Sequence, residues 1–246
     1  MFTFFNRKSR SPISLESLVS DMHSHLIPGI DDGVPDPETS LQLIAGLMDL
    51  GYKKLVTTPH INGDVFRNTP AIIGEGQTMV LRALQEAGMK VEFRAAAEYL
   101  MDDQFADTLL TGGSFLTLKD NLVLVELSFV VPALNLKDIL FQLQLKGYQP
   151  VLAHPERYLY FAGDKGWYDQ LRDSGCYFQL NLLSFAGYYG REARDLALYL
   201  VKKGYVDFLG TDLHHARHLE VLRSNQAIGK VVQQLEDRGL LRNSTL

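Results

Sequence analysis

DMHSHLIPGIDDG, residues 21–33, places two histidines and three aspartates in one turn-prone stretch. Side chains of an extended segment alternate between its two faces, so His23 and His25 point to the same side. Two imidazoles on one face can bind one metal ion. The stretch therefore predicts a metal site early in the chain.

Length and composition indicate a globular protein. The 246 residues are 46% hydrophobic and 22% charged, with a formal net charge of -5. Because no Pro/Gly/Ser-rich linker separates two periodic regions, residues 19–246 are predicted to form a single domain after an N-terminal tail, residues 1–18. The mild acidity argues against a partner such as nucleic acid, whose backbone needs clustered Lys and Arg.

The single cysteine and the lack of a long apolar run limit the cellular locations in which the protein is expected. Cys176 excludes an intrachain disulfide, is expected to be buried, and favours a reducing compartment such as the cytoplasm. No apolar run is long enough to span a bilayer, so no stable membrane insertion is expected. The tail MFTFFNRKSR, with aromatics before basic residues, does not follow the order of a secretory signal. Weak affinity of this tail for a membrane surface is the alternative.

From residue 19 onward, short apolar runs alternate with stretches of helical spacing. Strands are predicted in residues 53–60, 91–99, 121–128, 149–157, 177–183 and 206–214. Helices are predicted in residues 36–52, 132–148 and 191–205. One further helix is predicted to end near Gly175, and a final one to begin near Leu219. Asp36 or Thr39 would cap the helix that ends near Gly51. Repeated strand-then-helix units predict an α/β protein with a parallel sheet, open or closed as a barrel.

The residues suited to metal chemistry lie at the C-terminal ends of the predicted strands. They are His23, His25, His60, Glu98, Glu126, His154, Asp212 and His214. In parallel barrels this rim carries the active site. Taken singly, each is more simply a hydrogen-bonded histidine or a paired acid, and His215 and His218 are expected to be exposed at a helix start.

As a set, five histidines and four carboxylates, with Asp31 or Asp32 as the fourth, match the donors of Zn, Mn or Fe sites without thiolates. So many donors exceed the needs of one tetrahedral ion. Paired metals serve phosphoryl and ester hydrolysis, so a hydrolase is predicted.

Six motifs make the prediction more specific. They are Asp21-x-His23-x-His25 with PGIDDG, TPH at 58–60, Glu98, VEL around Glu126, HPER at 154–157 and GTDLH at 210–214. Over about residues 20–225 they resemble the PHP (polymerase and histidinol phosphatase) superfamily. Within it, LIPGIDDG and HPERY resemble the bacterial manganese-dependent protein-tyrosine phosphatases encoded with capsular and exopolysaccharide genes. The resemblance implies a distorted parallel (β/α)7 barrel, TIM-like, with three divalent ions, Mn first and Fe or Zn as alternatives.

The resemblance also implies a ligand set. His23, His25 and Asp212 would hold the first metal, with Glu98 bridging to the second. Glu126 and His154 would complete the second, and Asp32, His60 and His214 would hold the third. Spacing alone does not choose between Asp31 and Asp32; alignment with the family selects Asp32. Asp21 would orient a ligand histidine.

The expected reaction is hydrolysis of phosphotyrosine by metal-activated water, without a covalent phosphoenzyme. Arg157 is predicted to hold the phosphate oxygens, the alternative being a surface ion pair with Glu156. Arg217 is a second candidate, although the family's arginine lies slightly farther along. The candidates for walls around a phenyl group are Phe66, Phe129, Tyr158 and Tyr188, with ordinary packing as the alternative.

The substrate implied by the resemblance is the phosphorylated Tyr-rich tail of a polysaccharide-assembly tyrosine kinase. One alternative is a phosphatase for histidinol phosphate or another small phosphomonoester. A second is a non-catalytic kinase-docking module, and a nuclease-like activity is disfavoured because no basic groove is visible.

Overall fold

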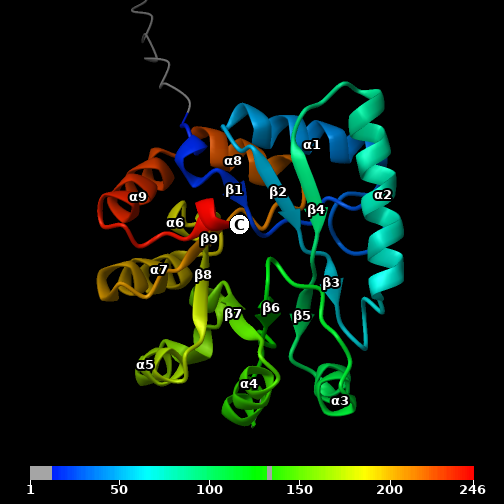
Figure 1. Ribbon diagram of the computed structural model, residues 1–246. Coiled ribbons are helices and arrows are strands. Elements are labelled where there is room, and N and C mark those ends of the chain that lie inside the picture. Colours follow the sequence, from blue (N-terminus) through cyan, green and yellow to red (C-terminus); the bar gives the residue numbers. More distant parts are fainter. Residues whose placement is uncertain (1–12, 132–134) are drawn as a thin grey trace, which may run out of the picture.

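Parallel strands flanked by helices form the protein (Figure 1), for which a computed structural model describes residues 13–131 and 135–246. A three-stranded sheet has the order β1 (Ser20–Asp21), β2 (Lys54–Thr57), β4 (Glu92–Ala95). A six-stranded sheet follows the order β3 (His60–Ile61), β5 (Glu98–Leu100), β6 (Leu122–Glu126), β7 (Gln149–Ala153), β8 (Tyr177–Asn181) and β9 (Phe208–Gly210). Every neighbouring pair within these two sheets is parallel, as the alternation of strands and helices predicts.

Two of the predicted strands are split between the sheets. The chain passes from β2 to β3, and from β4 to β5, over two residues in each case. Backbone hydrogen bonds from Ala96 N–H to the Thr57 carbonyl (2.8 Å) and from Glu98 N–H to the Pro59 carbonyl (3.1 Å) keep the two stretches paired across the break. His60 and Glu98 therefore begin strands of the second sheet instead of ending strands of the first.

The outer edges of the two sheets meet at the segments that follow β1 and β9. Asp212 N–H donates to the His23 carbonyl (2.7 Å), His25 N–H donates to the Leu213 carbonyl (2.9 Å), and Ser24 forms a parallel bridge with Leu213. Among the described residues, the paired strands form two parallel sheets, and these backbone hydrogen bonds join their edges. A continuous closed barrel of seven strands stays a prediction.

Helices cover the outside of the sheets (Figure 1). They are α1 (Pro37–Asp49), α2 (Pro70–Glu86), α3 (Asp103–Thr111), α4 (Leu136–Leu145), α5 (Gly166–Asp173), α6 (Leu182–Phe185), α7 (Arg191–Lys203), α8 (Ala216–Ser224) and α9 (Gln226–Asp237). Asp36 caps α1 by accepting from Thr39 N–H (2.8 Å), as predicted. The predicted last helix is wrong in its extent, because Asn225 has an extended backbone and its side chain caps a new helix, α9. Helices α2 and α3 were not predicted.

The N-terminal tail differs from the expectation in its last residues. Residues 1–12 lie outside the described part, but Ile13, Leu15 and Leu18 are buried in the core, so residues 13–18 are firmly packed. Cys176 is buried, as predicted. Within residues 13–131 and 135–246, no helix is both long and apolar enough to cross a membrane.

Candidate metal centre

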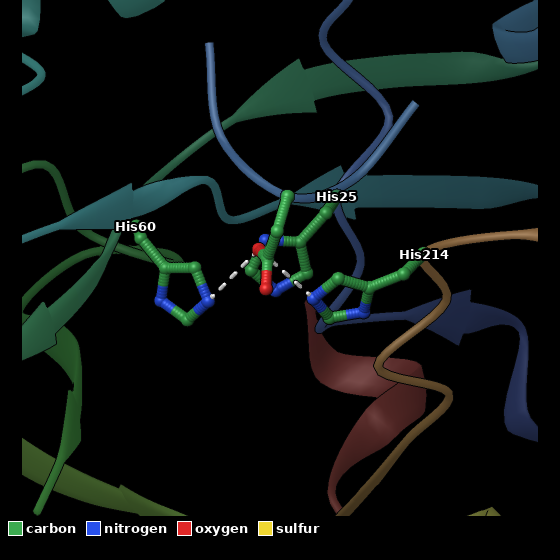
Figure 2. Close-up of side chains that lie close together, drawn as sticks. His25, His60 and His214 are labelled. Atoms are coloured by element: carbon green, nitrogen blue, oxygen red, sulfur yellow. Dashed lines mark ion pairs between the residues drawn. The ribbon is translucent and has the colours of Figure 1, made fainter. Parts of the chain in front are cut away.

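One cavity of about 390 Å³ gathers the predicted metal ligands. Its lining includes Asp32, His60, Glu98, Glu126, His154, Asp212 and His214. His23 and His25 are fully buried and contact the same groups. Figure 2 shows how the imidazole rings of His25, His60 and His214, from three distant segments, converge. The structure therefore brings all nine predicted ligands together.

Four of these donor atoms form a compact set. The Nε2 atoms of His23 and His25 are 3.4 Å apart. Glu98 Oε2 lies 3.1 Å and 3.5 Å from them, and Asp212 Oδ1 lies 3.4 Å from each. Three atoms about 3.4 Å apart can all lie about 2.1 Å from one point, which is the length of a metal–nitrogen or metal–oxygen bond. The geometry of His23, His25 and either carboxylate fits a divalent ion.

The remaining donors extend the set in two directions. Glu98 reaches beyond this compact set, since its Oε1 lies 3.0 Å from His154 Nε2. His60 Nδ1 lies 3.1 Å from Glu126 Oε1 and 3.3 Å from Glu98 Oε2. This arrangement gives Glu98 the position of a bridging acid.

Asp32 forms a third group at the mouth of the cavity. Its Oδ1 lies 3.5 Å from His60 Nε2 and 3.5 Å from His214 Nε2 (Figure 2). With His25, these residues offer four donor atoms within 4.8 Å of one another. These distances favour Asp32 over Asp31 as a metal ligand. The mixture of imidazole and carboxylate donors suits several kinds of divalent metal ion.

Two of the donors have a strained backbone. His154 (φ 35°) and Asp212 (φ 49°) are left-handed, a conformation that costs a non-glycine residue about 1–2 kcal/mol. Each follows a strand, β7 or β9, and turns its side chain into the cavity. Strain of this kind concentrates at functional sites, where the surrounding structure enforces it.

Gln179, which was not predicted, and Asp31, which was an alternative metal ligand to Asp32, orient the buried histidines. Gln179 Oε1 lies 2.7 Å from His23 Nδ1, and Asp31 Oδ2 lies 2.8 Å from His25 Nδ1. A proton held on each Nδ1 leaves each Nε2 lone pair on the side of Glu98 and Asp212. Burial would raise the pKa of Asp31, but the adjacent His25 outweighs it and lowers that pKa to about 2.

Buried charge makes this centre attractive to cations. Burial disfavours ionised Glu98 and Asp212, but the surrounding histidines hold both pKa values well below their ordinary range. Burial likewise opposes protonation of His23, yet Glu98 and Asp212 raise its pKa to about 9. A buried carboxylate stays ionised only when positive charge lies next to it. Divalent metal ions can supply that positive charge.

The structure places Asp21 next to Thr211 and His23, and its role in orienting a ligand histidine stays a prediction. Its carboxylate accepts from the backbone N–H (3.0 Å) and the hydroxyl (2.7 Å) of Thr211, and burial raises its pKa to about 6. Because Thr211 precedes Asp212, Asp21 anchors the backbone that presents this donor.

His218 is placed differently from the prediction. It is buried and lines the cavity, and burial lowers its pKa to about 4. It accepts, through Nδ1, from His214 N–H (3.4 Å). His215 is exposed, as predicted, and lies at the cavity wall.

Arg157 lines the same cavity and is firmly held. Its Nη1 donates to Asp212 Oδ2 (2.8 Å), and its guanidinium lies 4.7 Å from the ring of Phe129 and 4.1 Å from the ring of Tyr189. The alternative of an ion pair with Glu156 is wrong, because Glu156 is buried and accepts from Asn181 N–H and the Ser184 hydroxyl.

Arg217 does not line the cavity. It is exposed, with its guanidinium 6.0 Å from the ring of Tyr188. Of the aromatic candidates, Phe129 and Tyr188 form part of the wall. Tyr158 is fully buried beneath it, and Phe66 stacks on His60 at 5.4 Å. Tyr189, which was not predicted, completes the wall.

The chain is similar to known proteins of one family. A family model described as capsular polysaccharide synthesis, CpsB/CapC, matches residues 19–240. The chain is 27% identical over 198 residues to tyrosine-protein phosphatase YwqE of Bacillus subtilis (strain 168), covering 80% of this chain and 78% of that protein. It is 27% identical over 203 residues to tyrosine-protein phosphatase CpsB of Streptococcus pneumoniae, covering 79% and 82%.

A solved structure gives the same result in three dimensions. It comes from crystal structures of YwqE from Bacillus subtilis and CpsB from Streptococcus pneumoniae, which are described as unique metal-dependent tyrosine phosphatases. The TM-score is 0.78 at 26% identity, covering 91% of this chain and 94% of that one.

Proposed function

The chain belongs to the capsular polysaccharide synthesis family CpsB/CapC, and from this premise we propose that it is a metal-dependent protein-tyrosine phosphatase. The observation that carries the proposal is one cavity in which a compact set of buried donors, the Arg157 guanidinium and aromatic side chains meet. Cationic groups suit a phosphate dianion, and aromatic walls suit the phenyl group that carries it.

The proposed ligands are those predicted from the sequence. His23, His25, Glu98 and Asp212 would hold one ion, Glu98, Glu126 and His154 a second, and Asp32, His60 and His214 a third. Three ions, with Mn as the physiological metal, are the finer part of the proposal; Fe and Zn accept the same mixture of imidazole and carboxylate. Divalent ions bound there activate water as the nucleophile and neutralise charge on the phosphate.

The chain's own residues bind and orient the substrate. Arg157 has a planar fork of donors that matches two phosphate oxygens, and its stacking between Phe129 and Tyr189 holds the fork towards the cavity. Asn181 donates to the same oxygen of Asp212 as Arg157 does (2.9 Å), so that the other oxygen faces His23 and His25. This preorganisation lowers the cost of stabilising charge in the transition state. Arg217 would act only outside the cavity, on a larger substrate.

The aromatic wall of the cavity and the matched family support a substrate class. We propose phosphotyrosine in a protein, with a bacterial tyrosine kinase of polysaccharide assembly as the partner and the cytoplasm as the location. An exposed mouth lined by Phe129 and Tyr188 favours an aryl phosphate over histidinol phosphate. The complete donor set favours catalysis over a docking role alone.

Phosphate release tests the proposal. Metal-stripped protein should hydrolyse a phosphotyrosine peptide only after Mn is added, and much faster than a phosphoserine peptide or histidinol phosphate. Metal content of the loaded protein, measured independently, should approach three ions per chain. Preference for histidinol phosphate, or no release with metals bound, would refute the assignment.

A further inference from the structure

Three consecutive apolar side chains lie exposed two residues beyond the end of β6 (Leu122–Glu126). Phe129 is 48% exposed, Val130 86% and Val131 58%. Single exposed apolar residues are common in soluble proteins, but a contiguous group beside a cavity is typical of a contact surface. We call Phe129, Val130 and Val131 the apolar ridge.

Hydrogen bonds fix the base of the apolar ridge. Leu127 N–H donates to the Tyr158 hydroxyl (2.9 Å), and the Tyr160 hydroxyl donates to the Ser128 carbonyl (3.0 Å). Val130 N–H donates in turn to the Ser128 hydroxyl (3.2 Å). Because the backbone is already held, little ordering entropy is lost when a partner binds.

The apolar ridge is continuous with the proposed active site. Phe129 lines the cavity, with its ring 5.7 Å from that of His154 and 4.7 Å from the Arg157 guanidinium. Val130 and Val131 follow Phe129 in the chain and are more exposed than it is. A partner that fills the cavity is therefore brought against these two valines.

The size of the cavity decides which part of a substrate meets the apolar ridge. A volume of about 390 Å³ is near the lower end for ligand sites and suits one phosphorylated side chain. The backbone of a protein substrate must then cross the mouth, where residues next to the phosphotyrosine reach the rim.

We infer that the apolar ridge binds an apolar side chain adjacent in sequence to the phosphotyrosine of the substrate protein. This inference rests on the proposed function and adds a preference for the substrate's sequence. The two valines carry no charge or hydrogen-bonding group, so they favour an apolar neighbour over a charged one.

The test compares three substrates of the full chain loaded with Mn. One is a phosphotyrosine peptide with leucines flanking the phosphotyrosine, the second has serines there, and the third is p-nitrophenyl phosphate. In the double variant Val130→Ser, Val131→Ser, kcat/KM for the leucine peptide should fall about tenfold, mainly through KM. The other two substrates should change by less than about twofold. Leu110→Ser, an exposed residue on α3 outside the cavity lining, is the matched control and should leave all three unchanged.

Each other outcome overturns the inference. An equal fall for all substrates would mean that the valines support the catalytic centre, and no change would mean that they contact no substrate. If the double variant alters only sedimentation, the apolar ridge joins two copies of this chain instead. Failure of the unaltered protein to hydrolyse any aryl phosphate would refute the proposed function itself.

Discussion

Replacing Gln179 by leucine should weaken metal binding without unfolding the protein. Gln179 Oε1 lies 2.7 Å from His23 Nδ1, and both side chains are fully buried. The substitution removes the acceptor that keeps the ring proton on Nδ1, so the Nε2 lone pair is no longer held towards Glu98 and Asp212.

The expected size follows from this single contact. Loss of a hydrogen bond to a metal-ligating histidine costs about 10–100-fold in affinity, or about 1.4–2.7 kcal/mol. The effect on folding should be smaller. Gln179 Nε2 is itself buried without a hydrogen-bond partner among the described residues, so its removal offsets part of the penalty at His23.

Calorimetric titration of Mn into metal-stripped protein measures the change. We expect the Kd of the tightest site to rise 10–100-fold, and kcat to recover to within a few-fold at saturating Mn. Gln149→Leu is the control, because Gln149 bonds the Gly175 carbonyl at the start of β7, away from the cavity. An unchanged Kd in a folded Gln179→Leu variant would refute the reasoning.

Three further predictions concern charge at and near the site. Asp212→Asn keeps a side chain that tolerates φ 49° but removes the charge facing His23, His25 and Arg157. Turnover should fall at least about 100-fold, while the circular dichroism spectrum stays unchanged. Near-normal turnover would contradict the role of Asp212 as a metal ligand. Mn at 100 times its Kd should stabilise metal-stripped protein by about 2.7 kcal/mol, raising Tm by about 5–11 °C, and the absence of a shift would contradict a metal site. Burial raises the pKa of Glu156 from 4.5 to about 7, so the folded state keeps a proton that the unfolded chain has lost, and its stability falls as pH rises through this window. Urea unfolding should show the free energy of unfolding of the parent falling by about 2–3 kcal/mol more than that of Glu156→Gln between pH 5 and pH 8, and equal losses would contradict the shift.

The sequence was informative where a pattern depends on neighbours along the chain. Alternation put His23 and His25 on one face, and Asp36 before Pro37 marked the start of α1. Both follow from local geometry, which a short stretch specifies by itself. The last helix was misjudged because the competing cap at Asn225 lies within an otherwise regular apolar pattern.

Partners far apart in the chain were harder to predict. Gln179 and Asn181 are alternate residues of the strand YFQLN, so two polar side chains on one face of an apolar strand were a signal that could have identified them. The family resemblance implied that Asp21 orients a ligand histidine. In the fold its carboxylate also accepts from Thr211, which is 190 residues away.

By itself, the sequence determined the chemical nature of the site: which imidazoles and carboxylates are available, and that they follow successive strands of a parallel α/β fold. Only the tertiary structure decided their mutual geometry. The spacing of about 3.4 Å around His23 and His25, the left-handed turns at His154 and Asp212, and the burial of His218 all arise where distant strands meet. Metal affinity depends on those distances to within fractions of an ångström, and distances between segments far apart in the chain are set by packing and not by local sequence.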